Sequence, residues 1–247
     1  MSGELIRSQL PTAVLYDDTG ALTDFAHIDF NDNAGAMTID YQHVWHLVTD
    51  WDTNEFSVLS TPDQANNRVI FAATKAYGIS FKTAADVAGA PATFTMDGFC
   101  VCATPITVVG ITKANPGVVE TATAHGLLAG DHVKITGCTT MTEPNNKIWF
   151  VGTVADPTHF ELHTAEDANV NTGAWGVYDA SSGEMTAAER TCAWTENKYT
   201  NGVLSSKAAP PVPCSAVAGS AFELYARNKT GNGNVTLENG CLTVRRW

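Results

Sequence analysis

The sequence is poor in charge. Asp, Glu, Lys and Arg make up 16% of its 247 residues, whereas an average soluble domain has about 25%. Thr, Ala, Asn, Gly and Ser take their place, and this mixture suits strands joined by turns better than solvated helices. Basic residues are the scarcer kind, so the formal net charge is −12. This acidity disfavours both nucleic acid and anionic membranes as partners.

Long apolar runs are also missing. No run of about 18 apolar residues occurs, so no transmembrane helix is expected. The first residues, from Met1 to Arg7, lack a basic segment followed by an apolar core. We therefore expect no signal peptide, and synthesis in a reducing cytoplasm is the default expectation.

Signatures of catalysis and of cofactor binding are absent as well. The sequence has no GxSxG, no P-loop and no GxGxxG, and its cysteines show no zinc-type spacing. His43 and His46 fall three apart on an expected strand and so point to opposite faces. His159 and His163 share a face, but they lie about 13 Å apart along an extended strand. We therefore expect no catalytic residue, no cofactor and no metal site.

The six cysteines form no CxxC pair. An even count could form disulfides, but the length of the chain and the lack of an export signal favour free thiols that serve as small core residues. Cys100 and Cys102 flank Val101 and would share one face of a strand. The full set is Cys100, Cys102, Cys138, Cys192, Cys214 and Cys241.

Two weaker site candidates involve a turn and the tryptophans. Residues 50–55 resemble a loose calcium loop but lack its glycine and its final glutamate, so a solvated turn is the preferred interpretation. Trp51 and Trp194 have polar neighbours and could be exposed for sugar stacking. The apolar strands around the others predict core or interface positions for Trp45, Trp149 and Trp175.

Strand signal is what the chain has in abundance. We expect strands at residues 38–48, 68–73, 76–81, 92–102, 221–226, 235–238 and 242–246. Turns with Asn, Asp and Gly separate them, including Asn239-Gly240 between the last two. The best helix candidates are short, at 82–87 and 185–190. Many short strands at regular spacing predict a sandwich or a barrel.

From about residue 106 to 186 the pattern of strands and turns is that of a small, self-contained β module. We expect its strands at 106–113, 118–122, 132–136, 148–151 and 159–163. In one of them, His132, Lys134 and Thr136 are expected on one face. Val133 and Ile135 are expected on the other.

The same segment carries Ala124-His125-Gly126-Leu127, then Gly130-Asp131, Ile135-Thr136-Gly137 and Phe160-Glu161-Leu162. This series resembles the first-catalytic-cysteine-half-domain-like barrel, a module named after ubiquitin-activating enzymes and widespread in phage structural proteins. The resemblance implies a barrel fold. It implies no catalytic cysteine, and Cys138 has no evident base beside it in the sequence.

The flanks resemble phage jelly rolls of the tumour-necrosis-factor/C1q type, most clearly in the closing residues 234–246. This resemblance implies that residues 77–102 pair with residues 222–246 around the module, an insertion that loop-closure entropy tolerates. We therefore expect an all-β fold, a jelly-roll sandwich interrupted by an inserted small β-barrel. The expected divisions are an N-terminal arm at 1–35, the first part of the jelly roll at 36–105, the module at 106–186 and the second part at 187–247.

These resemblances imply a structural protein of a bacteriophage particle, assembled in the host bacterial cytoplasm. The jelly-roll likeness implies a homotrimer that buries an apolar face around a three-fold axis. Phe222, Tyr225 and Trp247 are the candidate interface residues.

A capsid decoration or cement protein, bound to the major capsid protein or to other virion proteins, is the leading hypothesis. The alternative is a tail fibre, baseplate or neck component with a receptor- or glycan-binding role. An enzyme such as a depolymerase would need converging carboxylates or a nucleophile with a base. The sequence gives no positive signal for either arrangement.

Overall fold

The computed structural model describes residues 25–31, 37–39, 41–49, 51, 54–58, 60–88, 94–192, 205–229 and 233–246. Strands make up 53% of the chain and helix 2%, so the predicted all-β class is confirmed. A short 3-10 turn, η3, lies at Gln64–Asn66. Within the described residues, no helix is long and apolar enough to cross a membrane.

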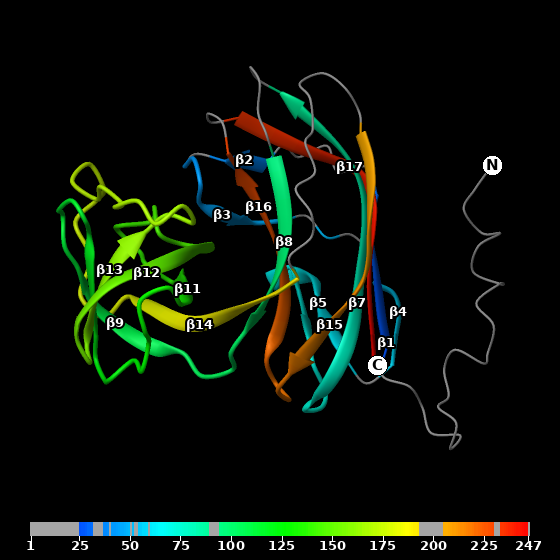
Figure 1. Ribbon diagram of the computed structural model, residues 1–247, viewed down its shortest axis with the longest axis horizontal. Coiled ribbons are helices and arrows are strands. Elements are labelled where there is room, and N and C mark those ends of the chain that lie inside the picture. The colour runs from blue at the N-terminus through cyan, green and yellow to red at the C-terminus, as the bar shows by residue number, and fades with distance from the viewer. Residues whose placement is uncertain are drawn as a thin grey trace.

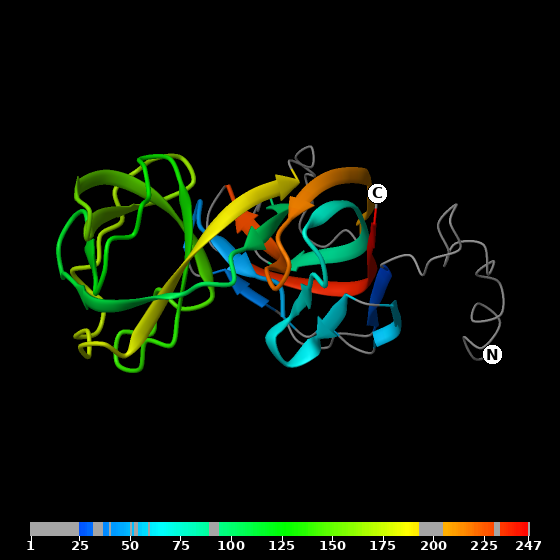
Figure 2. The same cartoon turned by 90° about the horizontal axis from the view of Figure 1, so that it is seen from below.

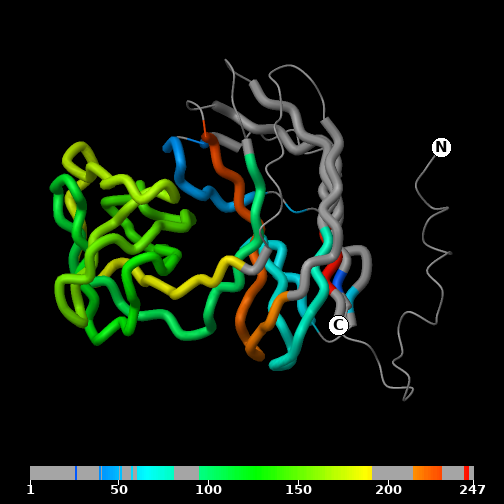
Figure 3. The backbone as a smooth tube through the Cα atoms, viewed as in Figure 1, coloured from blue at the N-terminus to red at the C-terminus, as the bar shows by residue number. Residues whose placement is uncertain are grey.

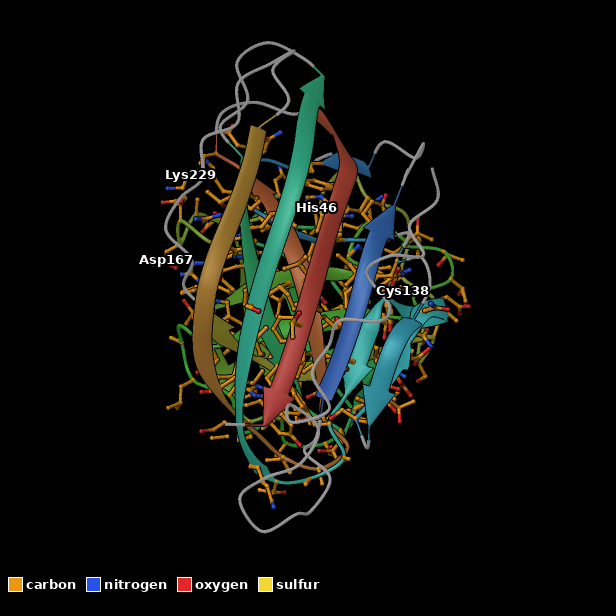
Figure 4. All side chains as sticks on the ribbon, turned by 90° about the vertical axis from the view of Figure 1, so that its right-hand side faces the viewer. His46, Cys138, Asp167 and Lys229 are labelled. Atoms are coloured by element: carbon orange, nitrogen blue, oxygen red, sulfur yellow. The ribbon has the colours of Figure 1, made fainter. Side chains whose placement is uncertain are left out.

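One layer of the molecule is a six-stranded antiparallel sheet, called here the outer sheet (Figures 1 and 4). Its strands, in spatial order, are β15 (Ser205–Ala216), β7 (Lys75–Ala88), β17 (Gly233–Arg246), β1 (Phe25–Asn31) and β4 (Asn54–Val58), with β2 (Met37–Ile39) also paired to β17. In Figure 4 this sheet faces the viewer, and no other described strand lies over it.

A second layer, called the inner sheet, packs behind the first. Its strands are β8 (Phe94–Val101), β16 (Ala221–Asn228), β3 (Trp45–Leu47), β6 (Arg68–Ile70) and β5 (Thr61–Asp63). Tyr77, Ile79 and Leu242 of the outer sheet form one buried cluster with Phe222 and Leu224 of the inner sheet. The two layers therefore form a β-sandwich with an apolar core.

Residues far apart in sequence pair in both layers. β7 and β17 align from Ala88–Asn234 to Tyr77–Arg246. β8 and β16 align from Phe94–Asn228 to Val101–Ala221. The predicted pairing of residues 77–102 with 222–246 is confirmed.

The intervening chain forms a closed circuit of strand pairings, called here the ring (Figure 2). The circuit runs through β9 (Ile106–Ile111), β10 (Val118–Thr121), β13 (His159–His163), β12 (Lys147–Asp156), β11 (His132–Thr136) and β14 (Gly183–Cys192), and back to β9. Val133, Trp149, Phe160 and Leu162 are among the buried residues that fill it.

The ring is not set apart from the sandwich as a separate unit. β14 runs from the ring to the sandwich, as the yellow tube in Figure 3 shows, and there it pairs with β8. β3 pairs with both β12 and β16. A second closed circuit therefore joins β3, β12, β11, β14, β8 and β16, and we call it the junction. The predicted boundary at 186/187 falls inside β14, and an inserted barrel is not confirmed.

Several local predictions are wrong, for a shared reason. Residues 82–87 and 185–190, expected as short helices, lie in β7 and β14, where pairing with a strand on each side overrides helix propensity. Asn239-Gly240, expected as a turn, lies inside β17, next to a register shift. Residues 25–31 of the expected N-terminal arm form β1, which pairs with β17 and β4.

Candidate functional site

The three strands shared by the ring and the junction serve a different core with each face. On β11, Val133 and Ile135 point into the ring core, as predicted. His132 and Lys134, on the opposite face, contact residues of the inner sheet. The period-two alternation of a strand thus builds two interiors from one segment.

A buried ion pair lies at the centre of the junction. Lys134 Nζ donates to both carboxylate oxygens of Glu223 on β16, each at 2.7 Å. The Tyr225 hydroxyl donates to Glu223 Oε2 at 2.5 Å. Glu223 and Tyr225 are fully buried, and burial, with the Glu223 charge as a second cause, raises the pKa of Tyr225 well above its usual value. This network joins the ring to the sandwich through charge.

Aromatic side chains surround that network. Phe99 on β8 makes edge-to-face contacts with Trp45, at 5.6 Å between ring centroids, and with Tyr225, at 5.3 Å. The guanidinium groups of Arg190 and Arg227 lie over the Trp45 ring, 5.6 and 4.5 Å from its centroid. The junction therefore has an apolar core of its own, apart from those of the ring and the sandwich.

His132 lies partly buried between aromatic rings of the junction. Its imidazole makes edge-to-face contacts with Phe99 and Phe150, at 5.5 and 4.9 Å. Burial, and secondarily the charge of Arg190, lowers the pKa of His132 to about 4. At neutral pH this histidine is therefore an uncharged packing residue.

A cleft of about 500 Å³ opens at one end of the junction. Lys134 and Glu223 line it together with Arg68, Glu184 and a set of hydroxyl and amide side chains, namely Thr49, Asn66, Asn67, Thr136, Asn146 and Thr186. Glu223 accepts three hydrogen bonds, two from Lys134 and one from Tyr225, whereas Lys134 has three N–H groups and gives two of them to Glu223. The cleft is chemically suited to hold a small polar group by hydrogen bonds.

The predicted arrangement of His43 and His46 is wrong. The chain turns at His43, which has φ 61°, so the two histidines do not share one strand. His43 Nδ1 lies 3.7 Å from Glu166, whereas His46 is buried on β3 with Nδ1 2.9 Å from the Val44 carbonyl oxygen. Among the described residues, no group of three or more His, Cys, Asp or Glu could hold a metal ion.

The two histidines of β13 share a face, as predicted, and each meets a carboxylate. His159 Nδ1 lies 2.9 Å from Asp156, and His163 Nδ1 lies 2.7 Å from Asp167. The hydrogen bond with His159, followed by two from Thr158, holds the pKa of Asp156 far below its usual range. These are separate local pairs on the ring and form no common site.

The predicted interface residues Phe222 and Tyr225 need correction. Both are fully buried, because β16 pairs on both sides and lies between the sandwich core and the junction. Every side chain of that strand is buried. Neither residue can therefore form a surface of the single chain, and Trp247 lies outside the described residues.

The predictions for the tryptophans were also correct only in part. Trp45, Trp149 and Trp175 are buried as expected, and Trp51, a candidate for an exposed sugar-stacking residue, is only 5% exposed. Trp194 lies outside the described residues, as does much of the 50–55 turn. Four cysteines are free thiols, as expected: Cys100, Cys138 and Cys214, which are buried, and Cys102, which is exposed.

The Lys134–Glu223 pair was not predicted as a site. A signal for it exists, because each charged residue interrupts an apolar strand, in Val-Lys-Ile and in Phe-Glu-Leu. The two lie 89 positions apart, so only the fold brings them together. No protein-family model matches this chain, and no curated protein matches it.

Proposed function

We propose that this chain is a non-enzymatic structural protein of a bacteriophage particle that assembles as a homotrimer through its outer sheet. The observation that carries the proposal is the outer face of that sheet, which no other described strand covers (Figure 4). A sheet face of several long strands is a broad surface on which another copy can pack.

The outward side chains that the structure describes on this sheet are small. Strand alternation places Tyr77, Ile79 and Val244 inward, in the core. The outward positions beside them are Ala76, Ser80, Ser215 and Thr243, which are half-buried or exposed, and Gly78, which is buried. Small side chains keep a sheet face flat, so two copies can approach closely.

One edge of the outer sheet is poorly suited to assembly. β15 is an edge strand that contains Pro210, Pro211 and Pro213. Its register with β7 shifts between Ala209 and Val212. Proline lacks the N–H that a new neighbouring strand would need, so growth by edge pairing is blocked there. This favours the face as the assembly surface.

The ring completes the proposed design as a lobe held in fixed orientation. Strand pairing and the Lys134–Glu223 pair attach it to the inner sheet, away from the outer one. Such a lobe suits a capsid decoration protein bound to the major capsid protein, our first choice. It suits equally a tail fibre, baseplate or neck component, but the buried state of Trp45, Trp51, Trp149 and Trp175 removes their support for sugar stacking.

Light scattering on the purified chain tests the assembly. We expect about three times 26.3 kDa. Ser80→Arg should convert the trimer to a folded monomer, because it would bury an unpaired guanidinium group in each interface. Thr153→Arg, at an exposed position of the ring, is the matched control and should leave the trimer intact. A monomeric parent chain at micromolar concentration contradicts the proposal.

The place in the particle is tested separately. Mass spectrometry of purified phage particles that encode this chain should find it in multiples of three relative to a shell or tail component. Electron microscopy then distinguishes the capsid from the tail by the position of the density. Particles that lack the chain altogether exclude the structural role.

A further inference from the structure

Two thiols from opposite sheets meet in the core of the sandwich. Cys100 lies on β8 of the inner sheet and Cys214 on β15 of the outer sheet, 7% and 3% exposed. Both belong to the same buried cluster. The Cys214 side chain is a hydrogen-bond partner of Cys100, so the two thiols are neighbours between the layers.

We propose that Cys100 and Cys214 form an oxidation site, at which a peroxide links the two sheets through a disulfide bond. Both residues are free thiols in this structure, which therefore represents the reduced form. A second contact holds the first thiol in place, because Cys100 Sγ lies 3.4 Å from Ser220 Oγ. A disulfide needs an S–S distance of about 2.05 Å, and two thiols that already share a hydrogen bond are placed to approach it.

The reaction balances with hydrogen peroxide as the oxidant. The Cys100 thiolate attacks one peroxide oxygen, the O–O bond breaks, and sulfenic acid forms while the released hydroxide takes up a proton to become water. The Cys214 sulfur then attacks the Cys100 sulfur, the S–O bond breaks and a second water leaves. Two thiols are oxidised to one disulfide, and one peroxide is reduced to two waters.

The surroundings favour Cys100 as the attacking group. The hydrogen bond with Cys214 lowers the pKa of Cys100, while burial opposes this effect. Cys138 in the ring core offers a contrast, because burial raises its pKa to about 11. Thiolate is the reactive form, so Cys100 should react before Cys138.

The disulfide bond would close a loop of chain that contains the whole ring. The chain between Cys100 and Cys214 contains every strand of the ring, from β9 to β14. Closing so long a loop restricts the unfolded chain, so the oxidised protein should unfold at a higher temperature. This chemistry needs only the folded chain and an oxidant, and it does not depend on the assembly role.

Peptide mapping of the full-length chain tests the site. Trypsin releases Cys100 and Cys102 together in residues 83–113, and Cys214 in residues 208–227. The experiment therefore uses a Cys102→Ser background, treated with hydrogen peroxide. We expect these two peptides joined, with a loss of about 2 Da relative to their sum, and a rise of several degrees in Tm that a thiol reductant reverses.

Matched variants complete the test. Cys214→Ser in the same background should lose both the cross-linked peptide and the rise in Tm. Cys138→Ser, which removes a buried thiol elsewhere, should keep both. The proposal is overturned if the peptide containing Cys100 stays unlinked after oxidation, or if it is joined to a cysteine other than Cys214.

Discussion

The ring uses one continuous stretch of chain, residues 106–192, whereas the described strands of the sandwich combine residues 25–101 with residues 205–246. In the ring, β12 and β13 are joined by a two-residue turn, and β9 and β10 by a short loop. In the sandwich, β7 pairs with β17 across more than 140 residues. The ring is therefore the region of lower contact order, and we expect it to form earlier in folding.

The difference also explains the junction. A ring that forms first would offer its β11, β12 and β14 faces as a ready surface, on which β3, β8 and β16 could then pair. His132 and Lys134 are two of the polar residues that β11 presents on that surface. Until the sandwich forms, the Lys134 ammonium group has no Glu223 carboxylate to bind and stays hydrated. The ion pair therefore belongs to the docking of the two regions and not to the stability of the ring alone.

Removing one member of that pair should have the largest effect. Lys134→Met leaves the fully buried Glu223 without its cation, and we expect a loss of about 3–5 kcal/mol in the free energy of unfolding. The double variant Lys134→Met/Glu223→Leu should regain most of it. Urea unfolding measures both, with the exposed Lys113→Met as the control. Equal losses in the single and double variants would count against a buried ion pair.

Acid should act on the same junction through His132. Its pKa is about 4 in the folded chain and about 6.5 when unfolded. Between these values the unfolded chain binds the proton and the folded chain does not, so stability is complete above pH 6.5 and falls as pH drops toward 4. The loss is roughly 3 kcal/mol at most. His132→Gln should flatten this part of the curve of unfolding free energy against pH, and an unchanged slope would refute the assignment.

Prediction from sequence succeeded where the information is local. The alternation of His132 to Thr136 gave the two faces of β11 correctly, because a strand has only two faces. The helices expected at 82–87 and 185–190 failed, because pairing of those residues with distant strands decided their conformation.

The interface prediction failed at Phe222 and Tyr225 for a related reason. An aromatic-rich strand such as Ala221–Asn228 looks the same in sequence whether it covers a surface or fills an interior. β16 has the sandwich core on one side and the junction on the other, so Phe222 and Tyr225 fall inside. The core of the junction could not be predicted from the sequence, because its residues come from five strands that belong to both regions.

The ring has a packing constraint that should give an intermediate effect. A Cβ atom added at Gly152 on β12 would lie 2.3 Å from His163 Nε2 on the neighbouring β13. Gly152→Ala must therefore displace the imidazole, and we expect a loss of about 1–2 kcal/mol. In the double variant with His163→Ser the loss should largely vanish. Thermal unfolding measures both, and a full loss in the double variant would show that the backbone, not the imidazole, is the obstacle.

The smallest effect should come from the ion pair at the rim of the junction. Arg227 Nη1 on β16 lies 3.1 Å from Glu166 Oε1 in a ring loop, so this contact also connects the two regions. Glu166 is about half exposed, with a side-chain exposure of 47%, and water and salt screen its charge. Glu166→Gln should therefore lower the unfolding free energy by only about 0.5 kcal/mol, and less at high salt. A loss as large as that of Lys134→Met would mean that the rim, and not the buried centre, holds the ring to the sandwich.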